Sequence, residues 1–267
     1  MASSTEHTPR PVALITGASA GIGKAFAQRL AAGGHDLLLV ARDGVRLQQV
    51  ADELSLQYGI NAETMPADLA RDGGMRSVAN RISQMERLDY LVNNAGFGSK
   101  GRLANRPVAE QATMLELHVM APMLLTRAAL SGMIARKSGT IINVSSVAGF
   151  THAIGNVNYC ATKAYLRVFS EGLALELTGT GVHVQALCPG FTRTEFHDRA
   201  AIDMKSTPGF LWLEATRVVD DSLAQAARGG PTVCVPGFWY KMIVLLVRYL
   251  PQWLIRAIRT PLMKSRA

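Results

Sequence analysis

The stretch Pro11-Val12-Ala13-Leu14-Ile15-Thr16, followed by Gly17-Ala18-Ser19-Ala20-Gly21-Ile22-Gly23, decides the fold class of this chain. The first six residues form an apolar run of strand length, and the next seven read as a glycine-rich turn. Residues 24–32 then favour a helix, which Gly33 and Gly34 end. Glycines in such a turn let the backbone approach a phosphate, and the N-terminus of the following helix offers free N–H groups to it. We therefore expect a nucleotide site here, although three residues separate the first two glycines, unlike the common G-x-G-x-x-G fingerprint.

The same alternation of apolar strands and helices continues along the chain. Further strands are expected at 37–41, 62–67, 88–92, 140–145, 182–187 and 232–235, and further helices at 45–56, 74–85, 108–135, 159–177 and 216–227. Strands that are apolar on both faces and separated by helices predict an α/β fold with a doubly wound parallel sheet of about seven strands. Ligands of such sheets bind at the carboxyl ends of the strands. These ends carry Gly17, Ala41, Asp68, Asn93, Ser146 and Pro189.

Length and composition indicate one globular domain. The chain has 267 residues, of which 48% are hydrophobic and 18% are charged, which suits a single α/β domain over 11–236. Residues 1–10 read as a disordered lead, 191–215 as a substrate-covering loop, and 237–267 as an apolar and basic extension. Neither the polar lead nor the three cysteines, Cys160, Cys188 and Cys234, indicates export or a metal site, so a cytoplasmic protein with free core thiols is expected.

The net charge of +8 is concentrated at one end of the chain. No acidic residue follows Asp221, and seven basic residues after it supply seven of the eight surplus charges: Arg228, Lys241, Arg248, Arg256, Arg259, Lys264 and Arg266. The main body is thus nearly neutral. A nucleic-acid-binding face spread over the whole domain is not expected.

A second stretch carries groups suited to acid–base chemistry. Tyr159 and Lys163 are four residues apart and so project from one face of the predicted helix. A nearby ammonium lowers the pKa of a phenol, which is otherwise about 10. Ser146, at the end of the preceding strand, is placed to hold a substrate oxygen while the phenol moves a proton.

These motifs together resemble the short-chain dehydrogenase/reductase family. The resemblance covers about residues 11–236 and rests on four elements in order: Thr16 to Gly23, Asn93-Asn94-Ala95-Gly96, Ser146 with Tyr159-x-x-x-Lys163, and Pro189-Gly190 followed by Thr194. It implies a single Rossmann-type domain that binds a nicotinamide dinucleotide and transfers a hydride between it and a carbonyl or alcohol carbon.

The resemblance also implies roles for individual residues. Tyr159 would be the acid–base, Lys163 would hold the nicotinamide ribose and lower the pKa of the tyrosine, and Ser146 would orient the substrate oxygen. The cofactor would be bordered by Gly17, Ser19, Gly21, Ile22, Gly23, Asp68, Leu69, Asn94, Ala95, Gly96, Pro189, Gly190, Thr192 and Thr194. The alternatives are purely structural roles. Asp68 would cap a helix, and Asn93 and Asn94 would form a turn that ends the strand.

His118 departs from the family pattern. Relatives usually carry an asparagine at this place in the long helix, where it helps to hold a water that feeds protons to the lysine. An imidazole both donates and accepts hydrogen bonds and titrates near pH 6.5. We therefore include His118 among the catalytic residues and expect an altered acidic end of the pH–rate profile, the alternative being an ordinary core histidine.

Arg42 bears on the choice of cofactor. An acidic residue at the end of the second strand would bind a ribose 2′-hydroxyl, whereas arginine binds a 2′-phosphate. Here Ala41 is neutral and Arg42 follows it, so NADP(H) is favoured over NAD(H). The alternative is that Arg42 is an ordinary exposed arginine. Asp43 adjoins it, and Ala20 stands where NADP-preferring relatives often have a basic residue.

The extension after residue 237 has two interpretations. Its apolar surface either packs against the domain or a second subunit, consistent with a homo-oligomer, or lies through 238–260 on an anionic membrane surface. The whole sequence thus predicts an NADP-dependent oxidoreductase acting on an apolar or lipid-like small-molecule carbonyl or alcohol. The alternative is a dinucleotide-binding regulator with catalysis weakened by His118, docking through its tail.

Overall fold

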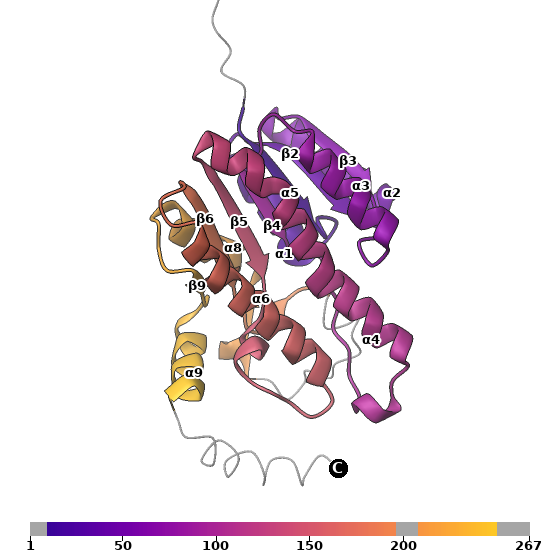
Figure 1. Ribbon diagram of the computed structural model, residues 1–267, viewed down its shortest axis with the longest axis vertical. Helices are drawn as coiled ribbons and strands as arrows, with labels where there is room; N and C mark the ends of the chain where they lie inside the picture. Colours follow the sequence, from indigo (N-terminus) through magenta and orange to yellow (C-terminus); the bar gives the residue numbers. More distant parts are fainter. Residues whose placement is uncertain (1–9, 196–207, 250–267) are drawn as a thin grey trace, which may run out of the picture.

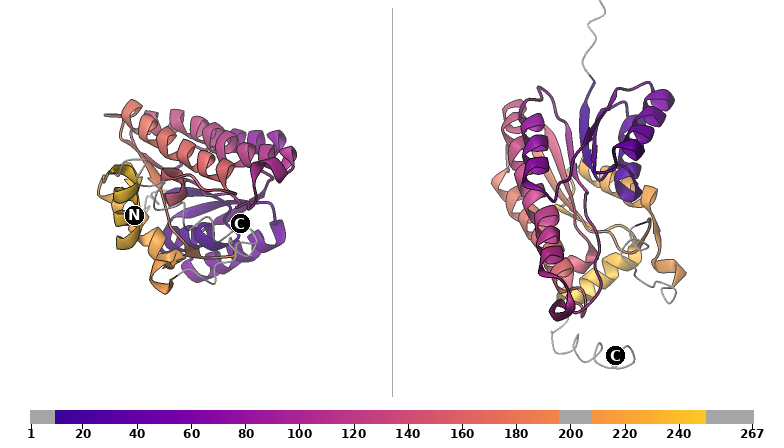
Figure 2. Two further views of the ribbon diagram at one scale, coloured as in Figure 1. Left: turned by 90° about the horizontal axis from the view of Figure 1, so that it is seen from below. Right: turned by 90° about the vertical axis from the view of Figure 1, so that its right-hand side faces the viewer.

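A parallel sheet lies between two layers of helices in the computed structural model, which describes residues 10–195 and 208–249 (Figures 1 and 2). The strand order is β3-β2-β1-β4-β5-β6-β9. The strands are β1 (Val12–Thr16), β2 (Asp36–Ala41), β3 (Ala62–Pro66), β4 (Tyr90–Asn93), β5 (Gly139–Val144), β6 (Val182–Leu187) and β9 (Val233–Cys234). Two further short strands, β7 (Thr192–Arg193) and β8 (Leu213–Glu214), pair with each other. The predicted doubly wound parallel sheet is confirmed.

Helices cover both faces of this sheet (Figure 1). They are α1 (Gly21–Ala32), α2 (Gly44–Tyr58), α3 (Asp72–Ser83), α4 (Val108–Leu115), α5 (Ala121–Arg136), α6 (Val157–Glu176), α8 (Ala215–Ala227) and α9 (Phe238–Tyr249). Short 3-10 turns are η1 (Leu103–Asn105), η3 (Val147–Phe150) and η4 (Gly209–Leu211). One core layer packs α1, α2 and α8 on the sheet, and the other packs α3, α5 and α6.

Alternation within β1 shows how the sheet builds both cores. Ala13 and Ile15 face the α1 side, whereas Leu14 between them faces the α3 and α5 side. All three are fully buried. Because successive side chains of a strand point to opposite faces, a strand covered on both faces must be apolar throughout.

The chain reverses its winding between β1 and β4. It runs outward from β1 to β3 and then returns to β4 on the other side of β1. At such a switch point the connections leave the two strands in opposite directions, which opens a crevice at their carboxyl ends. The glycine turn after β1 and the Asn94 segment after β4 border this crevice.

The predicted helix over 108–135 is interrupted. A π-turn, η2 (Glu116–Met120), separates α4 from α5 and contains His118. The stretch Val108–Arg136 is long and apolar enough to cross a membrane by length and composition. However, α5 packs Leu125 and Met133 into the core against the sheet, so this stretch is a core helix of the domain.

Three predictions concern residues outside the described ranges. They are the lead over 1–9, residues 196–207 of the predicted substrate loop, and the extension beyond Tyr249. The domain limits of 11–236 therefore stay a prediction. Cys160, Cys188 and Cys234 are buried and free, which confirms the expectation for the thiols.

Candidate active site

The glycine turn adopts a conformation that requires glycine. Gly17 and Gly21 have φ values of 66° and 54°, and a Cβ on Gly23 would lie 2.2 Å from the Gly17 carbonyl oxygen. Helix α1 starts at Gly21 with no side-chain cap and no acidic residue in its first turn. No side chain therefore caps its first N–H groups, which leaves them to an anion.

Hydrogen bonds to Thr16 hold the segment after β4 against this turn. Its Oγ1 accepts hydrogen bonds from the N–H groups of Asn94 at 2.9 Å and Ala95 at 3.0 Å. The Asn94 side chain in turn donates to the carbonyl oxygens of Thr16 at 2.9 Å and Gly17 at 3.3 Å. In the sequence, Thr16 is recognised only as the first residue of the glycine motif. Its role appears only when β1 and β4 are side by side, since 78 residues separate Thr16 from Asn94.

At the end of β2, Arg42 is exposed and makes no ion pair with any described residue. The adjacent Asp43 does not bind it, because Asp43 caps α2 by accepting the N–H of Arg46 at 3.0 Å. The Arg46 guanidinium pairs with Glu195, which follows β7. This pair, 149 residues apart, was missed by the sequence analysis and ties α2 to the segment after β7. Arg42 therefore remains available to a ligand.

Asp68 has a local structural role after β3. Its Oδ1 accepts the N–H of Ala70 at 3.1 Å in the turn before α3. The N-cap position of α3 is Arg71, so the alternative of a helix cap for Asp68 is wrong. The neighbouring Leu69 is buried in the core. The contact of these two residues with the cofactor stays a prediction.

Ser146 lies two residues after the end of β5 and joins two strand ends. Its Oγ accepts the N–H of Ala148 at 3.1 Å, which caps η3, and is 3.5 Å from the Pro189 carbonyl oxygen. The same carbonyl accepts the N–H of Val147 at 3.0 Å. Ser146 also hydrogen-bonds Tyr159. The structure thus brings the predicted serine and tyrosine together.

Lys163 is buried beside Tyr159. Its Nζ lies 5.7 Å from the centroid of the tyrosine ring and donates to the Val144 carbonyl at 2.8 Å. No carboxylate among the described residues pairs with it. Burial lowers the pKa of Lys163 to about 8. A buried ammonium with one protein acceptor has donors left for a ligand's oxygens.

The pKa of Tyr159 departs from the sequence expectation. The family resemblance implies that Lys163 lowers it, yet burial raises it to about 12, and the hydrogen bond with Ser146 offsets only part of that effect. Desolvation penalises the phenolate more than its surroundings stabilise it. The phenol is therefore protonated at neutral pH and poised to donate.

His118 is buried and fully engaged by the protein. Its Nε2 accepts the Phe97 N–H at 3.0 Å, and its Nδ1 lies 3.1 Å from the Thr162 Oγ1. Its ring meets that of Tyr159 edge-on at 5.9 Å. Burial, assisted by the charge of Lys163, lowers the pKa of His118 well below 6.5. The expected titration near pH 6.5 is thus wrong, because the ring is desolvated and stands near a cation.

The segment after β6 crosses the glycine turn. A Cβ on Gly21 would lie 3.2 Å from the side chain of Thr194, and Thr192 is buried. A Cβ on Gly190 would meet the ring of Tyr240 at 2.0 Å. In the sequence Tyr240 belongs only to the apolar extension, and no local signal marks this contact. It explains why glycine follows Pro189.

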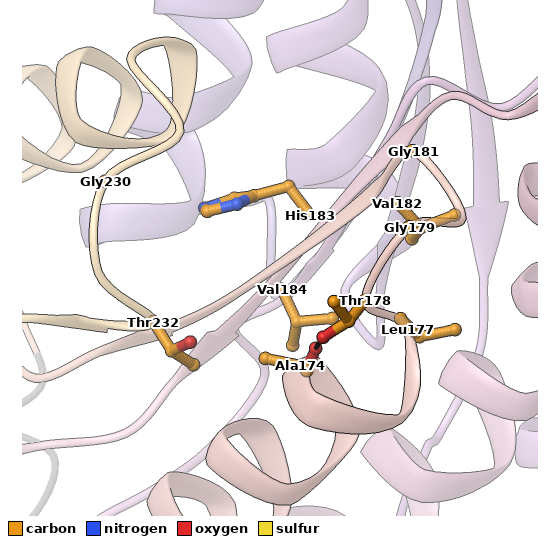
Figure 3. A pocket seen from close by; sticks show the side chains of 10 residues that line it. All are labelled: Ala174, Leu177, Thr178, Gly179, Gly181, Val182, His183, Val184, Gly230 and Thr232. Carbon is orange, nitrogen blue, oxygen red and sulfur yellow. Dashed lines mark hydrogen bonds between the residues drawn. The ribbon is translucent and has the colours of Figure 1, made fainter.

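An open depression of about 340 Å³ lies away from these groups (Figure 3). It is lined by the end of α6, the start of β6 and the segment before β9, including Leu177, Val182 and Thr232. Val182 is the first residue of β6, so the depression is at the amino ends of the strands. The predicted site residues are at the opposite ends, and this depression has no part in the site.

The residues at the carboxyl edge fit a dinucleotide. The uncapped start of α1 suits a pyrophosphate, exposed Arg42 suits a 2′-phosphate, and buried Lys163 suits ribose hydroxyls. The glycines leave no Cβ between the turn and such a ligand.

Three comparisons agree with this arrangement. A family model described as short chain dehydrogenase matches residues 11–205. The 3-oxoacyl acyl-carrier-protein reductase of Aquifex aeolicus is 35% identical over 185 residues, which are 69% of this chain and 75% of that protein.

Among solved structures, a short-chain dehydrogenase from Sphingobium yanoikuyae in complex with NADPH has a TM-score of 0.82 at 35% identity, covering 91% of this chain and 97% of that one. A bulky-bulky ketone specific alcohol dehydrogenase from Comamonas testosteroni has a TM-score of 0.77 at 31% identity, covering 91% and 95%. The likeness thus extends over nearly the whole of both solved chains.

Proposed function

The chain belongs to the short-chain dehydrogenase/reductase family of oxidoreductases, and from this premise we propose that it reduces an apolar ketone, or oxidises the matching secondary alcohol, with NADP(H) and with Tyr159 as the acid–base. One observation carries the proposal. The Tyr159 phenol, hydrogen-bonded to Ser146 and beside buried Lys163, lies at the same sheet edge as the uncapped glycine turn.

Ser146, Tyr159 and Lys163 have separate roles in the proposed reduction. When bound, NADPH supplies the hydride that adds to the carbonyl carbon. Ser146 holds the carbonyl oxygen, and Tyr159 gives it the phenolic proton, so that ketone, hydride and proton become a secondary alcohol. Because the pKa of Tyr159 is raised to about 12, its resting form carries the proton to be transferred. Lys163 holds the ribose hydroxyls and stabilises the phenolate that remains until it regains a proton.

Two features support NADP(H) over NAD(H). Arg42 is exposed at the end of β2 and unengaged by any described carboxylate, and Asp43 is occupied as a helix cap. The argument from the adjoining Asp43 is thereby weakened, while the one from neutral Ala20 stands. The solved relative from Sphingobium yanoikuyae holds NADPH.

An apolar substrate is supported by the side chains past β6. Phe191 and Trp212 lie with ring centroids 6.0 Å apart, and Phe191 and Phe210 are 38% and 61% exposed. Exposed aromatic side chains beside a site favour apolar ligands. The relative from Comamonas testosteroni is described as acting on bulky ketones.

A substrate screen tests the proposal. Ketones of increasing bulk are offered with NADPH, and the matching alcohols with NADP, while nicotinamide fluorescence is followed. We expect turnover that rises with apolar bulk and that is lost in Tyr159→Phe. NADPH binding without turnover across the panel would instead favour the dinucleotide-binding regulator.

A further inference from the structure

Helix α9 exposes an unusual amount of apolar surface. Seven of its twelve residues are large hydrophobic side chains that are at least 39% exposed: Phe238, Trp239, Met242, Ile243, Leu245, Leu246 and Tyr249. Single exposed apolar residues are ordinary, but a contiguous set marks an interaction surface. We call these seven residues the α9 face.

The opposite side of α9 is fixed to the domain. Tyr240 is 3% exposed, and its hydroxyl donates to the Leu211 carbonyl at 2.7 Å and accepts the Phe191 N–H at 2.9 Å. Val244, one turn later, packs in the same cluster, which includes Val147 of η3. The orientation of α9 is therefore set by buried contacts, and the α9 face is directed away from the domain.

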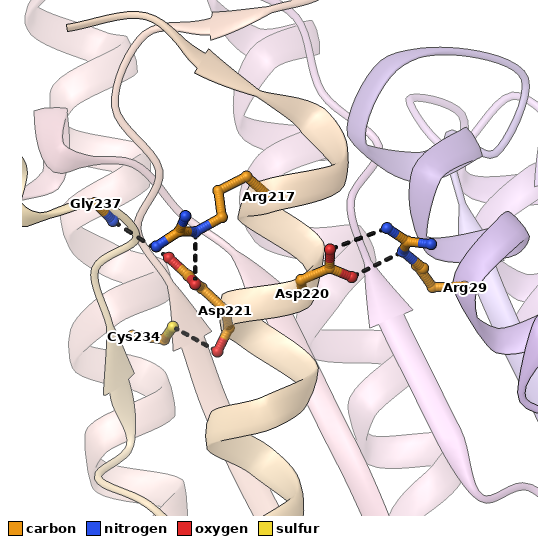
Figure 4. Close-up of polar contacts among 6 residues, drawn as sticks. All are labelled: Arg29, Arg217, Asp220, Asp221, Cys234 and Gly237. Atoms are coloured by element: carbon orange, nitrogen blue, oxygen red, sulfur yellow. Dashed lines mark hydrogen bonds and ion pairs between the residues drawn. The ribbon is translucent and has the colours of Figure 1, made fainter. Parts of the chain in front are cut away.

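The residue before α9 is also held by a hydrogen bond (Figure 4). The Gly237 N–H donates to Asp221 Oδ2 at 3.4 Å, and the Arg217 guanidinium binds Asp221 Oδ1 at 3.0 Å. Asp221 is the last acidic residue in the sequence. The acid that binds the residue before α9 is thus already paired with Arg217.

The charges of α9 border its apolar face. At 100° per residue, the α9 face fills an arc of about 160° that contains no charged residue. Lys241 and Arg248, both exposed, fall within about 60° of one border of that arc, beside Leu245. An apolar arc with aromatic side chains and flanking basic residues is the pattern of a helix lying in a membrane interface.

Charge decides between a membrane and a second copy of the chain. Residues 222–267 carry seven basic side chains and no acidic one. A two-fold contact through the α9 face would bring the same patch on both subunits together, and so would face Lys241 and Arg248 with like charges. An anionic lipid surface complements both the apolar arc and the charges.

We propose that the α9 face docks the protein on anionic phospholipid bilayers. The seven side chains enter the boundary between headgroups and acyl chains, and Lys241 and Arg248 reach the phosphates. Phe210, whose ring centroid is 5.4 Å from that of Trp239, extends this surface toward the substrate segment. A charge at the centre of a membrane span costs about 2.5–3.5 kcal/mol, and α9 holds both Lys241 and Arg248, so the contact is peripheral. This docking is independent of the catalytic proposal.

Vesicle co-sedimentation of the full-length protein tests the docking. We expect binding to vesicles of phosphatidylcholine and phosphatidylglycerol that weakens with salt, and little binding to phosphatidylcholine alone. Trp239→Ser with Leu246→Ser should weaken binding at least tenfold. Lys241→Gln with Arg248→Gln should weaken it about 30-fold, from about 1 kcal/mol per charge. The control Val45→Ser with Leu56→Ser, two exposed apolar residues of α2, should bind as the wild type does.

Two results would overturn the proposal. One is equal binding by the wild type and the Trp239 and Leu246 double variant, with both proteins shown to be folded by circular dichroism. The other is a lipid-free dimer, detected by analytical ultracentrifugation, that this double variant converts to monomers while neither protein binds vesicles. That outcome would assign the α9 face to a second copy.

Discussion

His118 Nδ1 lies 3.1 Å from Thr162 Oγ1, while Nε2 of the same ring accepts the Phe97 N–H at 3.0 Å. Only a neutral imidazole accepts at Nε2. Because Thr162 Oγ1 donates to the Tyr159 carbonyl at 2.9 Å, the ring must donate through Nδ1. His118 therefore connects the segment after β4 to the helix of Tyr159, and we predict that it acts as a positioning residue.

The acidic end of the pH–rate profile should not depend on His118. Since the pKa of His118 is well below 6.5, the ring stays neutral at pH 6.5 and above. His118→Asn is expected to leave the shape of the profile unchanged while lowering kcat. Thr162→Val should lower kcat in the same way, and Thr162→Ser, which keeps the hydroxyl, should not. An acidic limb that moves only in the His118 variant would restore a proton-transfer role.

Tyr159→Phe should abolish most turnover without loss of cofactor. Removal of a general acid costs about 10²- to 10⁴-fold in rate. NADPH affinity, measured by fluorescence titration, should stay within a few-fold of the wild type. Tyr165→Phe, on the same helix and 36% exposed, is the matched control and should keep full activity. Comparable rates for the two variants would remove Tyr159 from the acid–base role.

Arg42→Ala should discriminate between the two dinucleotides. Loss of a hydrogen bond to a charged group costs about 1.5–3 kcal/mol, so the KM for NADPH should rise about 10- to 150-fold. The KM for NADH should change little. Arg76→Ala, which removes an exposed arginine paired with Asp72, serves as the control. Equal losses with both cofactors would show that Arg42 does not read the 2′-phosphate.

Burial of Lys163 should make stability depend on alkaline pH. Its folded pKa of about 8 lies below the usual 10.5, so the unfolded state binds more protons between these values. This contribution to the free energy of unfolding therefore rises with pH over that window, by up to about 3 kcal/mol, and its full cost applies below pH 8.

Urea unfolding from pH 7 to 10 measures this effect. Lys163→Met removes the titrating group, so the free energy of unfolding of the wild type relative to the variant should increase with pH. The difference between the two proteins removes the pH-dependent contributions of Cys188 and Cys234 to the free energy of unfolding. The pKa values of both thiols are raised to about 12. A difference that stays constant with pH would mean that the ammonium is solvated in the folded protein.

Tyr240 should stabilise the site through its hydroxyl and its ring. Tyr240→Phe leaves the Phe191 N–H and the Leu211 carbonyl without their partner, at a cost of about 1–3 kcal/mol. Tyr249→Phe, which is 74% exposed, should cost almost nothing. Gly190→Ala should destabilise more than Tyr240→Phe, because its Cβ would overlap the Tyr240 ring. Calorimetry and urea unfolding compare the three variants.

Much of the fold follows from local signals in the sequence. The run into Thr16, the glycines after it and the recurring apolar strands predicted a doubly wound sheet, since apolar periodicity and turn residues act over a few positions. The placement of Gly17, Asn94, Ser146 and Pro189 at one sheet edge followed from the parallel topology. The side-by-side position of Tyr159 and Lys163 followed from helix spacing alone.

Only the tertiary structure decided which contacts hold these groups and which protonation states they have. Tyr240 fills the space beside Gly190 from 50 residues away, Arg46 meets Glu195 across 149 residues, and no local pattern encodes either pair. The pKa of Tyr159 rises although a lysine stands four residues on, because desolvation depends on everything packed around the phenol and not on one neighbour. The sequence suggested that His118 titrates as part of a proton relay. Desolvation instead keeps its imidazole neutral.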